Sequence, residues 1–141
     1  MNTVIKAFEQ LCVTAGLKVA VSRVPDGAGW SGTPGQSTFV RYGSIHPLAG
    51  RTDGSTCTPD RDVSKRIQVT IVGPTPHATL AYSQQFIDAL CGKRITTPTR
   101  VTLQPIYLDQ DGELDRDDTV KPSVFMVPHI FGVDTTPINQ P

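Results

Sequence analysis

Six carboxylates lie within ten residues of this chain, in the run DQDGELDRDD at 109–118. Such a cluster could bind a divalent cation or perform acid/base hydrolysis. A calcium loop needs alternating oxygen ligands at three positions before its glycine, whereas Gly112 follows only two carboxylates. Hydrolysis requires a carboxyl whose pKa is raised by burial or by a close like charge, which a hydrophilic run does not supply. Because Asp-Gly between apolar segments is typical of a tight turn, we predict a connecting hairpin loop that projects from the fold.

The histidines and cysteines do not form a catalytic or metal-binding pattern either. No two histidines are four residues apart, and there is no HExxH motif. The three cysteines are odd in number and far apart, which favours neither a disulfide scaffold nor a zinc site and fits a reducing cytoplasm. We therefore predict a protein that is not an enzyme and holds no cofactor or metal at any of these residues: His46, His77, His129, Cys12, Cys57 and Cys91.

Composition narrows the function further. The chain has 141 residues, enough for one domain with a single core. Thirteen basic and thirteen acidic side chains make it formally neutral, which disfavours DNA binding by phosphate neutralisation. No apolar stretch approaches the roughly 20 residues that a membrane span requires, so we expect a soluble protein.

Two amphipathic helices are predicted from apolar residues at helical spacing. The first covers about 4–15. The second starts after Thr75, which can cap it, has Pro76 in its first turn, and ends at Gly92. The residues expected to be buried are Val4, Ile5, Phe8, Leu11, Cys12 and Ala15 in the first helix, and Leu80, Phe86, Ile87, Leu90 and Cys91 in the second.

Alternating apolar and polar residues predict strands at 17–24, 38–45, 66–73, 100–109 and 123–134. Pro105 and Pro128 lie inside the last two, and because proline cannot donate to a ladder, each marks a sheet edge or a bulge. Trp30, in the polar loop before the second strand, is either a core plug or an interface anchor.

The order helix, three strands, helix, two strands predicts an α+β fold. We expect a mainly antiparallel sheet of about five strands, with two helices packed on one face. The single domain, 1–141, would contain a long polar loop at about 46–65 and a loose C-terminal tail, TTPINQP. A loop of this length in a small domain is a candidate arm that reaches a partner.

The order of these segments resembles that of the tail terminator, or tail completion, proteins of long-tailed bacteriophages. An amphipathic N-terminal helix is followed by VAVSRVPDG, by STFVRYGSI, and by DRDVSKRIQVTIVG leading into HATLAYSQQFIDALCG. An extended segment, a variable polar loop and KPSVFMVPHIFGVDTTP end the chain. The resemblance spans nearly the whole chain and is one of order and hydrophobic pattern.

The resemblance implies a structural virion protein, assembled in the host cytoplasm as a hexameric ring. Such a ring caps the tube made of tail tube protein, ends its polymerisation and joins it to the head-tail connector protein. DNA passes through the lumen of the ring without specific binding. No membrane takes part. A ring of identical copies needs heterologous interfaces, which edge strands and the 46–65 arm could supply. The candidate interface or lumen residues are Trp30, Arg51, Arg61, Lys65, Asp109, Asp111, Glu113, Asp115, Asp117 and Asp118.

Two other functions stay open at this stage. A connector or stopper protein of the head–tail neck has similar requirements, and mutant particles with overlong tails or with no tails would separate the two. A small enzyme or ligand-binding domain would need a concave pocket with converging polar groups. The acidic loop would face the lumen or a neighbouring subunit, and an ion bridging such loops is the less favoured alternative, because open acidic loops bind divalent ions weakly.

Overall fold

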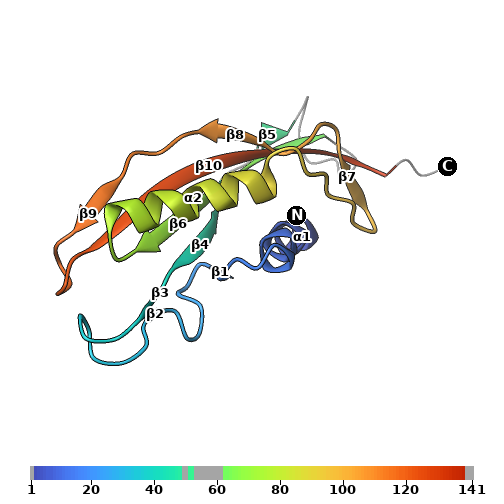
Figure 1. The fold of residues 1–141 in the computed structure, drawn as a ribbon. Coiled ribbons are helices and arrows are strands. Elements are labelled where there is room, and N and C mark those ends of the chain that lie inside the picture. Colours follow the sequence, from blue (N-terminus) through green and yellow to red (C-terminus); the bar gives the residue numbers. More distant parts are fainter. Residues whose placement is uncertain (1, 49–50, 53–61, 139–141) are drawn as a thin grey trace.

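The computed structural model describes residues 2–48, 51–52 and 62–138. Two helices, α1 (Asn2–Thr14) and α2 (Pro76–Leu90), pack against one face of a curved sheet (Figure 1). Within the described residues, the eight strands of this sheet are β1 (Val19–Val21), β4 (Tyr42–Pro47), β5 (Arg51–Thr52), β6 (Val63–Gly73), β7 (Arg100–Thr102), β8 (Tyr107–Gln110), β9 (Asp115–Asp117) and β10 (Val124–Pro137). A separate two-stranded ladder joins β2 (Gly29–Trp30) to β3 (Phe39–Val40).

The long strands β6 and β10 form the centre of the sheet. The strand order is β1-β4-β6-β10-β7, with β5 paired to β6 and with β8 and β9 both paired to β10. These pairs are antiparallel apart from β1 with β4, which is parallel. The α+β class, the mainly antiparallel sheet and the two helices on one face are confirmed, but the sheet has more strands than the five or so expected.

The helices end where local sequence rules place their ends. The Thr75 hydroxyl accepts a hydrogen bond from the Ala78 N–H at 3.2 Å and caps α2, whose first residue is Pro76. Gly92 follows the last turn with a φ of +85°, a left-handed conformation that glycine adopts without strain. The predictions that Leu80 and Ala15 are buried are wrong. Leu80 is 46% exposed, because α2 faces the sheet with Thr79, Tyr82, Ser83, Phe86 and Leu90. Ala15 is exposed, because α1 ends at Thr14, before this residue.

One face of the sheet forms the core with the helices. Alternate residues of β6 point to this face, as predicted, and Ile67, Val69 and Ile71 are fully buried. From α1, Phe8 reaches the ring of Phe131 on β10 at a centroid distance of 6.0 Å. From α2, Phe86 lies so close to β4 that a Cβ atom on Gly43 would be 2.7 Å from its ring.

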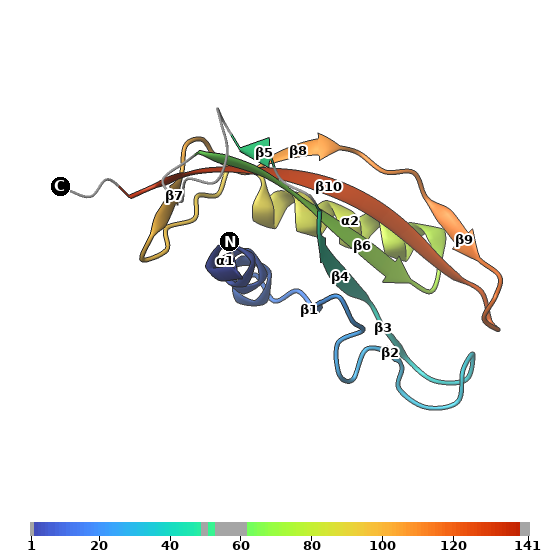
Figure 2. The same ribbon diagram turned by 180° about the vertical axis from the view of Figure 1, so that it is seen from behind.

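The other face of the same strands is covered by neither helix. Figure 2, seen from behind, shows β10 and β6 in front of α2. Residues that alternate with the core positions lie on this face and are mostly half-buried; they are Tyr42, Ser44 and His46 on β4, Ser64, Arg66, Gln68, Thr70 and Val72 on β6, and Val124, Met126, Pro128 and Ile130 on β10. We call this the open face.

Several predicted bounds are wrong. The segment 38–45 divides into β3 and β4, which belong to different sheets. The segment 100–109 divides into β7 and β8, and Pro105 lies between them. The polar loop at 46–65 contributes to β4, β5 and β6, and the C-terminal tail is strand as far as Pro137, which pairs with Arg100. The central parts of that loop and the last three residues lie outside the described residues.

Candidate functional site

The acidic run is a sheet edge, so the prediction of a projecting hairpin loop is wrong. Strands β8 and β9 pair one after the other with the same long strand, β10, and residues 111–114 connect them along its edge. A Cβ atom on Gly112 would lie 1.5 Å from the carbonyl oxygen of Pro128, so this position requires glycine. The glycine therefore permits close contact between two backbones instead of forming the turn. The reversal into β10 takes place at 118–123.

Pro128 lies where the edge ladder is interrupted. Its partner on one side is Thr70 of β6, and on the other side it faces the gap between β8 and β9, at Gly112. The missing N–H of proline is tolerated at such a gap. The prediction of a sheet edge at Pro128 is wrong, because β10 is a central strand, but its pairing with β8 and β9 is interrupted at this residue.

Three of the carboxylates accept hydrogen bonds from β9 and from the turn that follows it. Asp115 accepts the backbone N–H of Arg116 at 2.8 Å. Hydrogen bonds from the hydroxyl and the backbone N–H of Thr119 lower the pKa of Asp117. The pKa of Asp118 is also lowered, first by the Ser123 hydroxyl at 2.6 Å and then by Arg116. These side chains satisfy the turn's own donors.

Asp109 belongs to a network at the far end of the open face. The Nε atom of Arg66 lies 3.1 Å from Asp109 and its Nη1 atom 3.6 Å from Asp134. Burial opposes ionisation of Asp134, but hydrogen bonds from Ser64, Gln104 and Tyr107 together with the charge of Arg66 lower its pKa. The network joins β6, β8 and β10 by their side chains.

Asp111 lies beside the buried His129. The Nδ1 atom of His129 is 3.2 Å from both the Gly112 nitrogen and a carboxylate oxygen of Asp111. Burial lowers the pKa of His129, although Asp111 opposes this shift. Both this shift and the hydrogen bond from the Gly112 N–H to Nδ1 favour the neutral imidazole. The contact with Asp111 is an ion pair only when His129 is protonated.

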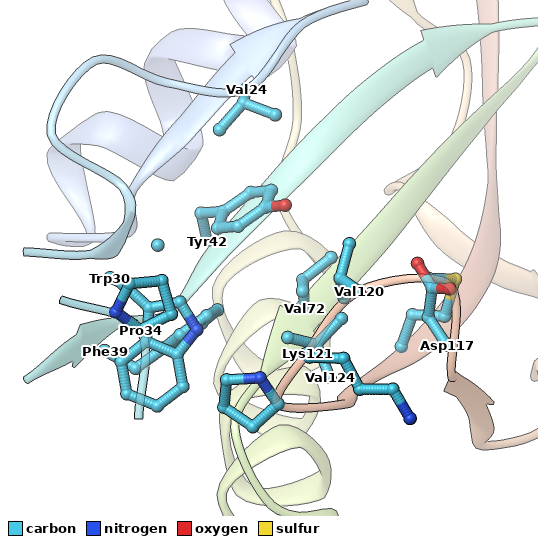
Figure 3. A pocket seen from close by; sticks show the side chains of 13 residues that line it. Val24, Trp30, Pro34, Phe39, Tyr42, Val72, Asp117, Val120, Lys121 and Val124 are labelled. Atoms are coloured by element: carbon cyan, nitrogen blue, oxygen red, sulfur yellow. The ribbon is translucent and has the colours of Figure 1, made fainter. Parts of the chain in front are cut away.

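An apolar pocket of about 490 Å³ lies between the β2–β3 ladder and the turn that leads into β10 (Figure 3). Trp30 and Phe39 pack edge to face at 5.1 Å, and Phe39 stacks on Tyr42 at 6.4 Å. Asp117 and Lys121 are the charged members of its wall. The remaining lining residues are uncharged and mainly apolar: Val24, Gly29, Pro34, Val72, Val120, Pro122, Val124 and Met126. We call this the aromatic pocket.

Trp30 is not a core plug. It is half-buried, belongs to no part of the main core and walls the aromatic pocket. Its role as an interface anchor stays a prediction. Sequence reasoning missed Tyr42, Val72 and Met126, although their alternation with core residues is visible in the strands. The missing information was that two distant segments close over the open face at this end.

The predicted residues do not converge on one site. Trp30 and Asp117 line the aromatic pocket, while the other acidic residues are distributed along the β8–β9 edge. Lys65 lies on β6, opposite Val133, and Arg51 lies on β5, opposite Ser64. Arg61 lies outside the described residues. Among the described residues, no three histidine, cysteine or acidic side chains form a group that could hold a metal ion.

The sequence matches no protein-family model and no curated protein. The solved structures that are similar to it along almost their whole length include the following two. A chain of the virion of a native gene transfer agent particle is 14% identical, with a TM-score of 0.56, and the match covers 96% of each chain. A second solved structure is 19% identical, with a TM-score of 0.51, and covers 99% of this chain and 96% of its own. This protein therefore shares its fold with a chain of a gene transfer agent virion. None of the described helices has the length and apolarity that crossing a membrane requires.

Proposed function

We propose that this chain is a structural protein of a phage-like virion. It acts as a tail terminator and forms a hexameric ring on the end of the tail tube. The observation that carries the proposal is the fold shared over 96% of both chains with a protein of a virion particle. The sequence order of the elements, which resembles tail terminators, supports the same role. The ring would end tube polymerisation and join the tube to the head-side connector.

The distribution of exposed surface suits a subunit that is covered by other subunits. The sheet has one face without helices, and its outer strands β8 and β9 present an acidic edge. A ring made from identical copies joins two different surfaces of each subunit, so it needs surfaces of this kind on separate sides. An acidic edge also disfavours retention of DNA, because it adds no affinity for phosphate.

The chemistry of the aromatic pocket does not favour an enzyme. A general acid or base works best with a pKa near the working pH. The pKa of Asp117 is lowered by hydrogen bonds from Thr119, and the pKa of Tyr42 is raised by burial and then by the charge of Asp117. Both shifts lead away from neutrality, so neither group is prepared for proton transfer near pH 7.

Disruption of the gene in its parent virus or virus-like element tests the proposal. Electron microscopy of the resulting particles should show tails of irregular and excessive length, because nothing ends tube growth. Normal tails that fail to join heads would assign the protein to the connector or stopper of the neck instead. Complementation with the intact chain should restore tails of uniform length, and particles unaffected by the disruption would refute a role in the virion.

A further inference from the structure

A groove of about 510 Å³ lies between the last turns of α1, the end of α2 and the segment that leads to β7. Its apolar lining comes from Ala7, Leu11, Ala89 and Ile95. Two exposed cations, Lys93 and Arg94, also line it, and none of its lining residues is acidic. We call this the helix groove.

The two cations of the helix groove are not neutralised within the described part of the chain. No described carboxylate lies within ion-pairing distance of Lys93 or Arg94. The nearest acidic residue in sequence, Asp88, accepts a hydrogen bond from Gln84 instead. The groove thus combines an apolar floor with positive charge, which favours an acidic partner that carries an apolar side chain.

The chain itself presents such a segment on another side of the molecule. In the connection between β8 and β9, Leu114 is 36% exposed and lies between Glu113 and Asp115. Glu113 is exposed and has no hydrogen-bond or ion-pair partner among the described residues. Figures 1 and 2 both show β8 and β9 along one outer edge of the sheet, with α1 on the opposite side of the molecule.

We infer that the helix groove binds the β8–β9 edge of a second copy of this chain. Leu114 of one copy lies on the apolar floor between α1 and α2 of the next, and Glu113 and Asp115 face Lys93 and Arg94. The two surfaces are different and lie on separate sides, so each copy can bind two neighbours head to tail, the arrangement that closes a ring. The inference rests on the ring of the proposed function and specifies its subunit contact.

Charge reversal tests this contact in the full-length protein. The groove variant carries Lys93→Glu and Arg94→Glu, and the edge variant carries Glu113→Lys and Asp115→Lys. Mass is measured by light scattering after gel filtration across a range of concentrations. Each variant should associate at least roughly tenfold more weakly than the unaltered chain, because like charges then face each other. A chain with all four substitutions should assemble again, since its surfaces are once more complementary.

Two controls separate the contact from general effects of charge and folding. Lys6→Glu with Arg23→Glu changes the net charge by the same amount as the groove variant, at exposed residues outside the helix groove and the aromatic pocket, and should leave assembly unchanged. Leu114→Ala removes the apolar contact without a change of charge and should also weaken assembly. Thermal melting of every variant shows that the subunit stays folded.

The outcomes separate this inference from the proposed function. If the unaltered chain assembles and the groove and edge variants assemble equally well, the contact is wrong while the ring stands. Loss of assembly in both variants without recovery in the fourfold variant also rejects the pairing of these two surfaces. If the unaltered chain remains a monomer at high concentration and in the presence of tail tubes, both the contact and the ring are rejected.

Discussion

The two faces of the sheet are made from the same strands, yet one is a core and the other is a surface. On the helix-covered face, Ile67 and Phe131 are fully buried in a cluster made mainly of apolar side chains. On the open face, the alternating positions pass from the aromatic pocket at one end, through polar side chains, to the network around Arg66 at the other. The covered face therefore determines the stability of the fold. The open face and the acidic β8–β9 edge contribute less to stability and are available for contacts with other subunits.

The largest expected effect comes from breaking the covered face. Phe86→Ala should lower the free energy of unfolding by about 3–5 kcal/mol, because it removes a fully buried ring that packs against Tyr82 and Gly43. Urea unfolding followed by circular dichroism gives the value. Leu80→Ala, on the same helix but exposed, is the matched control and should change it by about 0.5 kcal/mol or less. Similar losses for both variants would contradict the placement of the two faces.

A substitution in the β8–β9 edge of the sheet should have the next largest effect on the free energy of unfolding. Gly112→Ala places a Cβ atom within 1.5 Å of the Pro128 carbonyl oxygen and strains the hydrogen bond from Gly112 to His129. We expect a loss of about 1–3 kcal/mol, the usual range for forced overpacking. Gly32→Ala, where the new Cβ atom would lie 3.4 Å from that of Ser37, is the control. If Gly112→Ala were as mild as this control in thermal melting, the edge would not pass so close to β10.

The contrast between Gly112 and the helices shows what the sequence could predict. Thr75, Pro76 and Gly92 act on their immediate neighbours, so their local chemistry was sufficient to place the bounds of α2. The Asp-Gly step also has a local meaning, a tight turn, but here a long-range contact with Pro128 overrides it. Only the three-dimensional pairing of β8 and β9 with one strand reveals that contact.

The same reasoning explains why the surfaces were predicted less well than the core. The alternation in β6 identified Ile67, Val69 and Ile71 as buried, because a strand with one covered face has a period of two. It did not show which elements lie over the other face. The aromatic pocket needs Trp30 and Asp117 to approach one another across 87 residues of sequence, and the helix groove needs both helices in place.

The charged end of the open face should make a smaller, pH-dependent contribution. Asp134→Asn should lower stability at pH 7 by about 1–2 kcal/mol, since charge-assisted hydrogen bonds are lost from a side chain that is 17% exposed. The folded pKa of Asp134 lies below its ordinary value of 3.8. Its contribution is therefore complete above pH 3.8 and decreases as the pH falls through the folded pKa.

Unfolding measured between pH 7 and pH 2 checks this contribution. The unaltered protein should lose stability more steeply below pH 4 than Asp134→Asn does, so the two curves should approach one another in acid. A constant difference between the curves at every pH would show that Asp134 acts through its shape and not through its charge. Ser64→Ala removes one donor to the same carboxylate and should give a smaller effect in the same direction.

The smallest effect on folding should come from the acidic turn itself. Changing Asp115, Asp117 and Asp118 to Asn keeps an oxygen acceptor for the bonds from Arg116, Thr119 and Ser123, and all three side chains lie at the exposed edge, outside the core. The melting temperature should therefore fall less than in Gly112→Ala.

Magnesium should not raise the melting temperature of the unaltered chain or of this triple variant, because these carboxylates already accept hydrogen bonds and open acidic surfaces bind the ion weakly. Self-association should weaken nonetheless, since Asp115 belongs to the edge that meets Lys93 and Arg94. Melting and light scattering on the same samples test this separation of folding from assembly. A large loss of the folded subunit would place the turn among the elements that hold the covered face together, and a rise in melting temperature with magnesium would show that the edge binds the ion.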